Sequence, residues 1–309
     1  MSNLPDNRKI VLINIPGSHD STAYNINFFG SIFAKTQDLN IIEQLKIGIR
    51  KLDIRVTFHN CSFYCGINQI ETEYDLDLIC CHGICDCYYI NDHNIKKNIT
   101  YKDVLLDVKQ FLEENPSETI ILSTSSGRGN AYNNLKRATE IYEKIVGDIS
   151  IKYNNNLTLG DVRGKIVYTT YKTDKIDSEG NPIYNKGIEG GTGLEEIHQR
   201  FVSDKNYSTF EVGGKLKVEE MKELIKLNDI TIEEAGKEIK ENDKKFPISY
   251  SISCTGEHDT IVPLPKSQAD IVNTFILNYD LKKGYYYGWI NIDFVDLEVA
   301  KKIIDTNFI

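Results

Sequence analysis

The sequence lacks any long apolar run: no window approaches the roughly 18 consecutive apolar residues that a membrane-spanning helix requires. It also lacks clusters of basic residues, and its 36 Lys and Arg are outnumbered by 45 Asp and Glu, which gives a formal net charge of −9. Proteins that bind nucleic acid through its phosphates need such clusters, so we exclude nucleic acid as a partner. The same charge disfavours attraction to anionic membranes, and any membrane contact is expected to be apolar or brief.

Two glycine-rich phosphate-binding motifs are also absent. No G-x-G-x-x-G follows the first expected strand, and no G-x-x-x-x-G-K-[ST] occurs anywhere in the chain. Alternating strands and helices fit either a doubly wound open sheet or a closed (β/α)8 barrel, and these absences remove the commonest reasons to expect the open sheet. We predict an α/β fold, a single TIM-type barrel domain that spans residues 1–309.

Strands are expected where short apolar runs are rich in β-branched residues. These runs are Lys9–Ile15, Ile49–Val56, Leu76–Cys81, Thr119–Ser123, Lys165–Thr170, Pro247–Ser253 and Tyr287–Phe294, with an eighth strand near Tyr207–Val212. Helical periodicity predicts helices at Gln37–Leu45, Tyr101–Glu114, Ala131–Val146, Val218–Ile239, Gln268–Asn278 and Leu297–Ile303. The polar, glycine-rich stretch Thr173–Gly193 is expected to be a long loop.

The N-terminal residues Met1–Asp20 lack the basic, then apolar, then small-residue order of a secretory signal. Two interpretations stay open: the protein is not exported by that route, or a signal has been removed. The expected location is therefore either the cytoplasm or, after processing, the outside of the cell.

The seven cysteines form an odd total, and six of them fall within a short segment. These six are Cys61, Cys65, Cys80, Cys81, Cys85 and Cys87. A chain of this length does not depend on a disulfide framework of the small secreted kind. The spacing fits no common four-ligand zinc pattern, so we favour free thiols in a reducing compartment over a zinc site and leave one or two disulfides open.

Polar side chains stand at the ends of several expected strands. They are His19 and Asp20 after the first strand, Asp53 and Arg55 in the second, His82 after the third and Asp293 in the last. Barrel strands bring their carboxyl ends to one face, so these side chains are expected around a single cleft. Each also has a structural interpretation: a hydrogen-bonded loop histidine, or an ion pair between Asp53 and Arg55.

Two histidines with an arginine suit phosphodiester cleavage without a metal. One imidazole takes a proton from a nucleophile while the other gives a proton to a leaving group. The guanidinium is a fixed fork of donors for a phosphate whose charge grows in the transition state. A carboxylate behind one imidazole sets its tautomer and raises its basicity.

Six short motifs occur in an order that identifies a family. They are I-P-G-S-H-D (Ile15–Asp20), G-I-R-K-L-D-I-R (Gly48–Arg55), C-H-G (Cys81–Gly83), F-L-E-E-N-P-S-E-T-I-I-L-S (Phe111–Ser123), R-G-K-I-V (Arg163–Val167) and G-W-I-N-I-D-F (Gly288–Phe294). In this order the chain resembles bacterial-type phosphatidylinositol-specific phospholipase C from about Asn14 to Asp296. The G-S-H-D and N-P-S-E-T-I-I elements are the most specific.

The resemblance implies a distorted, incompletely closed TIM barrel and an intramolecular transfer reaction. The inositol 2-hydroxyl would attack the phosphorus, diacylglycerol would leave, and inositol 1,2-cyclic phosphate would form. By the same resemblance, His19 is the general base and Asp293 orients it. His82 would then be the general acid, with Asp20 behind it.

The resemblance also assigns Arg55 to a non-bridging phosphate oxygen, and Asp53 to the attacking hydroxyl and the guanidinium. Calcium-dependent relatives carry a carboxylate where this motif has its arginine, so the guanidinium would replace the cation. We therefore expect a metal-independent enzyme with no metal site and no cofactor.

The chain departs from the family at two cationic positions. Relatives have a lysine after the E-T-I-I strand, where this chain has Ser123–Ser126, and an arginine just after R-G-K-I-V. Lys172 compensates in part for the second loss, while Asp204 and Tyr207 match residues that contact the inositol ring. The headgroup therefore stays open among plain, phosphorylated and glycosylated phosphatidylinositol.

The stretch Asn27–Ala34 is a candidate membrane-contacting rim beside the first active-site loop. Its apolar residues are Phe28, Phe29, Ile32 and Phe33. Insertion of a rim helix into lipid is the functional interpretation, and ordinary core packing is the structural one. We expect a monomer that touches the membrane peripherally.

Two other functions are alternatives to this one. A metal-dependent glycerophosphodiester phosphodiesterase would need a carboxylate cluster on the second strand, where Arg55 stands. A catalytically weak or inactive module that binds phosphoinositides or a protein partner is the non-enzymatic alternative. The intact set of His19, His82, Arg55 and Asp293 argues against it.

Overall fold

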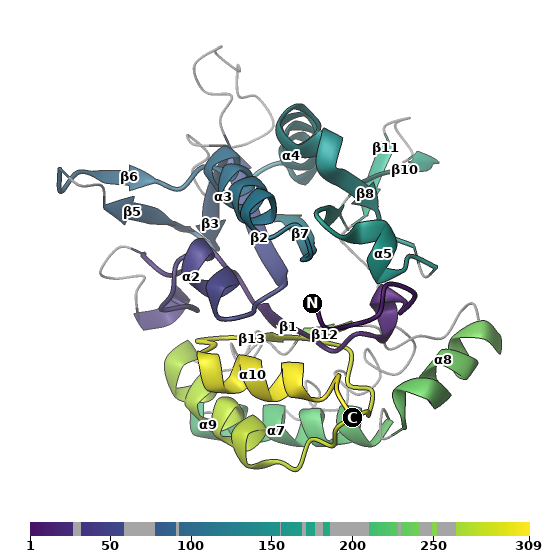
Figure 1. Ribbon diagram of the computed structural model, residues 1–309. Coiled ribbons are helices and arrows are strands. Elements are labelled where there is room, and N and C mark those ends of the chain that lie inside the picture. The colour runs from purple at the N-terminus through teal and green to yellow at the C-terminus, as the bar shows by residue number, and fades with distance from the viewer. Residues whose placement is uncertain are drawn as a thin grey trace.

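The computed structural model describes residues 1–26, 32–58, 78–90, 93–154, 156–168, 171–176, 182–185, 210–227, 230–241, 249–251 and 264–309. Within them lies one nine-stranded sheet in the order β12-β13-β1-β2-β7-β9-β8, with β3 paired to β2 and β4 to β3 (Figure 1). Its strands are β1 (Ile15–Ser18), β2 (Lys51–Phe58), β3 (Leu78–His82), β4 (Cys85–Asp86), β7 (Ile120–Ser126), β8 (Ser150–Lys152), β9 (Ile166–Tyr168), β12 (Ser249–Ser251) and β13 (Trp289–Ile292). Two separate hairpins are formed by β5 (Tyr88–Ile90) with β6 (Lys96–Asn98), and by β10 (Tyr171–Ile176) with β11 (Pro182–Asn185).

The seven strands from β12 to β8 pair in parallel. Parallel strands joined by helices bring their carboxyl ends to one edge, which is where such folds place their sites. No ladder joins β8 to β12 among the described residues. Over the residues that the structure describes, the sheet therefore does not close into a complete barrel.

Helices flank this sheet on its outer side. They are α2 (Ile41–Lys46), α3 (Tyr101–Glu114), α4 (Ala131–Val146), α5 (Leu159–Val162), α7 (Phe210–Leu227), α8 (Ile232–Glu241), α9 (Pro265–Asn278) and α10 (Leu297–Asp305), with 3-10 turns η1 (Ile10–Leu12) and η2 (Gly147–Ile149). Figure 1 shows α2, α3 and α4 on the side of β2 and β7, and α7, α9 and α10 on the side of β13. Of the helices described, none has the length and apolar character that crossing a bilayer demands.

Strand β2 has an apolar face and a polar face, because alternate side chains of a strand point to opposite sides of the sheet. Leu52, Ile54 and Val56 are fully buried in the large apolar core beneath the helices. The intervening Asp53 and Arg55 point to the opposite, inner face. The inner face is closed at the amino ends of the strands by a second apolar cluster that includes Ile15, Ile121, Val167 and Trp289.

The predicted first strand, Lys9–Ile15, is wrong over most of its length. Residues Ile10–Leu12 form a 3-10 turn, and β1 begins only at Ile15. Ile10, Val11 and Ile13 are all buried. An uninterrupted apolar run is equally typical of a buried turn and a buried strand, so periodicity could not separate the two here.

The helix predicted at Val218–Ile239 is two helices, α7 and α8. Thr231 begins α8 with a capping box: its hydroxyl accepts from the Glu234 N–H at 3.2 Å, and the Glu234 carboxylate accepts from the Thr231 N–H at 2.8 Å. The eighth strand predicted near Tyr207–Val212 is also wrong where it is described, because α7 begins at Phe210.

The long loop predicted at Thr173–Gly193 contains strands of its own. The antiparallel strands β10 and β11 occupy residues 171–176 and 182–185. Its turn-forming glycines and polar residues fit a hairpin as well as an irregular loop.

Candidate active site

His19 and Asp293 meet where β1 and β13 end. The two strands pair in register from Ile15 with Trp289 to Ser18 with Ile292, so the residues that follow them lie side by side. Nδ1 of His19 is 2.8 Å from Oδ1 of Asp293, and both side chains are buried. A carboxylate on Nδ1 fixes the tautomer with hydrogen on Nδ1 and leaves the Nε2 lone pair facing the site.

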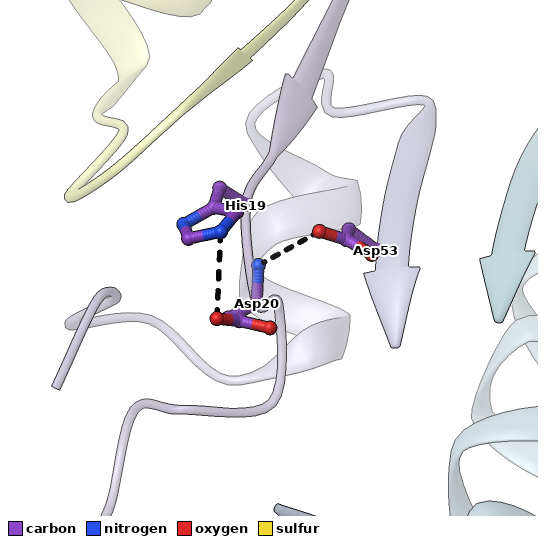
Figure 2. Close-up of side chains that lie close together, drawn as sticks. All are labelled: His19, Asp20 and Asp53. Atoms are coloured by element: carbon purple, nitrogen blue, oxygen red, sulfur yellow. Dashed lines mark hydrogen bonds and ion pairs between the residues drawn. The ribbon is translucent and has the colours of Figure 1, made fainter. Parts of the chain in front are cut away.

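Asp20 lies at the centre of the constellation. Its backbone has φ of +41°, in the left-handed region that non-glycine residues adopt only when their surroundings enforce it. Its Oδ2 is 3.4 Å from Nε2 of His19, and its backbone N–H points to Oδ2 of Asp53 at 3.5 Å (Figure 2). The Thr36 hydroxyl donates to the Asp20 carbonyl at 3.1 Å and holds this turn.

Arg55 projects from the inner face of β2 toward the same point. Its Nε is 2.6 Å from Oδ1 of Asp20, and one terminal nitrogen is 3.2 Å from Nε2 of His19. A quarter of its side chain is exposed, against 3% for His19, so the guanidinium faces the open side of the site. The guanidinium therefore places a positive charge beside Nε2 of His19, the ring nitrogen that does not contact Asp293.

His82 reaches the site by a route that the sequence did not predict. Its strand, β3, runs antiparallel to β2, with Val56 opposite Cys80, so His82 does not follow a parallel barrel strand. The imidazole nevertheless lies at the site: its Nε2 is 3.1 Å from Oδ2 of Asp20. His82 therefore lies beside Asp20 and His19, although the premise of a parallel strand was wrong.

A backbone carbonyl orients the His82 ring. Nδ1 of His82 donates to the carbonyl of Ala34 at 2.6 Å, which leaves Nε2 directed at Asp20 and the open side. The sequence assigned the position behind His82 to Asp20, but Asp20 contacts the nitrogen that faces the site. The two imidazole rings are 6.2 Å apart and nearly perpendicular.

Burial and neighbouring charges shift the pKa values of several groups at the site. Burial by itself would lower the pKa of His19, but the Asp20 and Asp293 carboxylates outweigh burial and raise that pKa to about 10. Burial raises the pKa of Asp293, and His19 opposes that rise. On the inner face of β2, burial lowers the pKa of Lys51 to about 8, against the attraction of Asp53.

Buried amides that sequence reasoning missed hold the ends of these strands. Gln37 donates from Nε2 to the carbonyls of His19 and Ile292, at 2.9 Å in each case. Asn273 donates to the carbonyl of Asp293 at 3.1 Å. A polar residue inside an expected helix or loop gives no sign of such a role, because the partner is a backbone carbonyl far away in sequence.

Several predicted site residues lie outside the described part of the structure. Phe28, Phe29, Asp204 and Tyr207 are among them, and Lys172 lies on β10 but its side chain is not described. The remaining rim residues, Ile32 and Phe33, are 53% and 44% exposed. Of the clustered cysteines, Cys61 and Cys65 also lie outside, while Cys80, Cys81, Cys85 and Cys87 are free.

Ligand atoms for a cation converge at one place among the described residues. One atom from each of His19, Asp20 and Asp53 lies within 4.8 Å of the others. The Arg55 guanidinium already contacts the Asp20 carboxylate at this place. A divalent cation would therefore have to displace or oppose a fixed positive charge.

The comparisons with known proteins agree with this fold. Residues 13–172, more than half of the chain, match the family model described as phosphatidylinositol-specific phospholipase C, X domain. The chain belongs to this family.

A 1-phosphatidylinositol phosphodiesterase of Listeria monocytogenes is 26% identical over 99% of this chain and 84% of its own length. One of Staphylococcus aureus is 31% identical over 54% of this chain and 48% of its own. The solved phosphatidylinositol-specific phospholipase C of Listeria monocytogenes superposes with a TM-score of 0.62 at 22% identity, over 100% of this chain and 98% of that one. The predicted α/β barrel class is confirmed.

Proposed function

We propose that this protein cleaves phosphatidylinositol by intramolecular phosphotransfer without a metal. The inositol 2-hydroxyl oxygen forms a bond to phosphorus, the bond from phosphorus to the glycerol oxygen breaks, and diacylglycerol and inositol 1,2-cyclic phosphate result. Membership of the phospholipase C X-domain family supports the substrate and the reaction. The observation that carries the metal-free mechanism is Arg55 beside both Asp20 and His19.

His19 is the general base of this proposal. Its Nε2 lone pair takes the proton from the 2-hydroxyl while Nδ1 stays bonded to Asp293. Against the opposing effect of burial, the Asp20 and Asp293 carboxylates raise the pKa of His19, so they stabilise the imidazolium that forms when the base accepts its proton. Neighbouring carboxylates thus strengthen the base in the transition state.

Arg55 and Asp53 hold the reacting groups. The guanidinium donates to a non-bridging phosphate oxygen, where negative charge increases as the hydroxyl attacks. Asp53 lies two residues before Arg55 on the same inner face of β2, and its carboxylate accepts a hydrogen bond from the attacking hydroxyl. A fixed charge already in place needs no reorganisation at the moment of reaction.

His82 is the general acid, and it gives its proton to the departing glycerol oxygen. Its Nδ1 is held by the Ala34 carbonyl, so Nε2 is the nitrogen that faces the site. Asp20 contacts that nitrogen and keeps the proton on it until the leaving group arrives. Base and acid then lie on two sides of the phosphate, as an in-line transfer requires.

The protein would reach its lipid as a monomer with a peripheral apolar contact. Ile32 and Phe33 are exposed just before Ala34, whose carbonyl holds His82. A membrane-contacting segment bonded to the acid places the scissile phosphate of a bilayer lipid near the catalytic groups. Exposed apolar side chains of this kind favour interfacial binding.

The test is cleavage of phosphatidylinositol in the presence of EDTA. Purified protein should release inositol 1,2-cyclic phosphate from phosphatidylinositol vesicles, at a rate that added Ca²⁺ does not change. Activity seen only with Ca²⁺ would refute the metal-free mechanism. Binding to the lipid without any product would favour the inactive phosphoinositide-binding module instead, and a panel of phosphorylated and glycosylated lipids would define the headgroup.

A further inference from the structure

The hairpin that carries His82 pairs with β2 over only a short stretch. Strand β3 pairs with β2 only from Leu78 to Cys80, so His82 lies two residues beyond the last paired position. The chain then turns at Gly83, with φ of +55°, and Ile84 at the tip is 67% exposed. The imidazole needs a fixed backbone to act as an acid, and pairing to β2 does not supply one at this point.

Arg128 supplies a second attachment. It follows the end of β7 and forms an ion pair with Asp86, on the returning strand of the hairpin. A second guanidinium nitrogen lies 3.5 Å from the carbonyl of Gly83, the residue next to His82. One planar side chain thus reaches both the turn at Gly83 and the returning strand β4, and only 12% of it is exposed.

The backbone of Arg128 is itself fixed to the main sheet. Its carbonyl accepts from the Thr57 hydroxyl at 3.0 Å and from the Asn134 side-chain amide at 2.7 Å. The preceding Gly127 donates its N–H to the Val56 carbonyl at 2.9 Å. A Cβ at Gly127 would lie 2.2 Å from Sγ of Cys81, so this segment packs directly against the strand that leads to His82.

We propose that Arg128 is a positioning residue for His82: it holds the β3–β4 turn against the end of β7 and so keeps the acid beside Asp20. Arg128 acts through the hairpin, because its guanidinium contacts Gly83 and Asp86. The inference rests on the proposed function, because it assigns Arg128 a part in protonating the leaving group.

The dependence on the leaving group tests this proposal. A glycerol alkoxide needs protonation as it leaves, whereas a p-nitrophenolate does not. Arg128→Met should therefore lower turnover of phosphatidylinositol at least tenfold while changing turnover of p-nitrophenyl inositol phosphate less than twofold. Asp86→Asn, at a side chain that is 38% exposed and so tolerant of replacement, should give the same pattern and keeps the test valid if Arg128→Met does not fold.

Two further measurements separate positioning from a general structural effect. In a His82→Ala background, Arg128→Met should cause no additional loss, because its effect passes through the imidazole. Arg137→Met, which breaks an exposed ion pair with Glu140 on α4, is the matched control and should leave both turnovers unchanged.

The outcomes are distinguishable. Equal losses on both compounds, no loss on either, or a full additional loss in the His82→Ala background would each overturn the role of Arg128. Failure of the wild-type protein to cleave either compound would instead contradict the proposed function itself.

Discussion

His19 and Asp293 lie 274 residues apart in sequence and 2.8 Å apart in space, Nδ1 to Oδ1. The contact exists because β1 and β13, the first and last strands of the sheet in chain order, are neighbours within it. Gln37 then holds both strand ends through the carbonyls of His19 and Ile292. The acid–base chemistry of the proposed mechanism therefore depends on the pairing of β1 with β13.

Asp293→Asn should separate the orientation of His19 from its basicity. The amide keeps the size of the side chain but removes a carboxylate that raises the pKa of His19. We expect kcat to fall by about 10³–10⁴, as for the equivalent change in a catalytic triad. Because the pKa of His19 falls, the base form appears at lower pH, and the acidic limb of kcat/KM should move downward in pH. A limb that stays in place or moves upward would contradict the assignment of His19 as base.

Arg55→Lys should show that the shape of the cation matters as well as its charge. The guanidinium contacts Asp20 through Nε and His19 through a terminal nitrogen, a fork that an ammonium group cannot reproduce. Loss of a donor to the developing phosphate charge is expected to lower kcat by about 10²–10³. Steady-state kinetics on phosphatidylinositol would measure this, and a loss smaller than threefold would remove Arg55 from the transition state.

The parallel strands and their terminal residues could be predicted from sequence. Asp53 and Arg55 alternate on β2 with Leu52, Ile54 and Val56, which are fully buried, as the period of a strand requires. The position of His82 was predicted on the premise of another parallel strand. A short strand carries the same local pattern in either direction, so its antiparallel pairing with β2 could not be read from it.

Other parts of the site depend on contacts that leave no local pattern. Gln37 bonds to carbonyls of two strands, and Ala34 offers only its backbone to His82. A backbone carbonyl is common to every residue type, so sequence alone gives no sign of it. The same is true of Arg128, whose partners Gly83 and Asp86 are some forty positions earlier in the chain.

Gly17→Ala should destabilise the protein through a direct clash. A Cβ at Gly17 would lie 2.1 Å from Oδ1 of Asn291 and 3.0 Å from Cβ of Lys51, both on neighbouring strands. Overpacking of this kind costs about 1–3 kcal/mol in free energy of unfolding. Gly147→Ala is the matched control, because its backbone is helical and the nearest atom would be 3.9 Å away, so a change within about 0.5 kcal/mol is expected. Chemical denaturation measures both, and equal effects would show that the inner face has room at Gly17.

Lys51→Met should stabilise the folded protein in a pH-dependent way. Burial lowers the pKa of Lys51 from 10.5 to about 8, so the folded state disfavours the charged amine. Below pH 8 the Lys51 amine is charged in both the folded and the unfolded protein, so the folded state bears the full free-energy cost of burying that charge. Between pH 8 and 10.5 Lys51 stays protonated only in the unfolded protein, so the destabilisation caused by burying Lys51 declines as the pH rises.

The advantage of Lys51→Met should therefore be greatest below pH 8, at about 3 kcal/mol, and shrink toward pH 10.5. Denaturation curves of both proteins across this range measure the difference. Lys46→Met, at an exposed position on α2, should show no such trend. An advantage that grows with pH would contradict the burial of a charged Lys51.

Phe33→Ser should weaken binding to the membrane without affecting the chemistry. Phe33 is 44% exposed beside Ile32, and transfer of half an aromatic side chain into lipid contributes about 1 kcal/mol, or roughly a fivefold change in affinity for vesicles. Sedimentation with phosphatidylinositol vesicles measures that affinity, and a soluble short-chain substrate measures kcat apart from it. Leu106→Ser, at a side chain of α3 that is 45% exposed, is the control. If both variants bind vesicles equally well, or if Phe33→Ser lowers turnover of the soluble substrate instead, this segment is not the membrane contact.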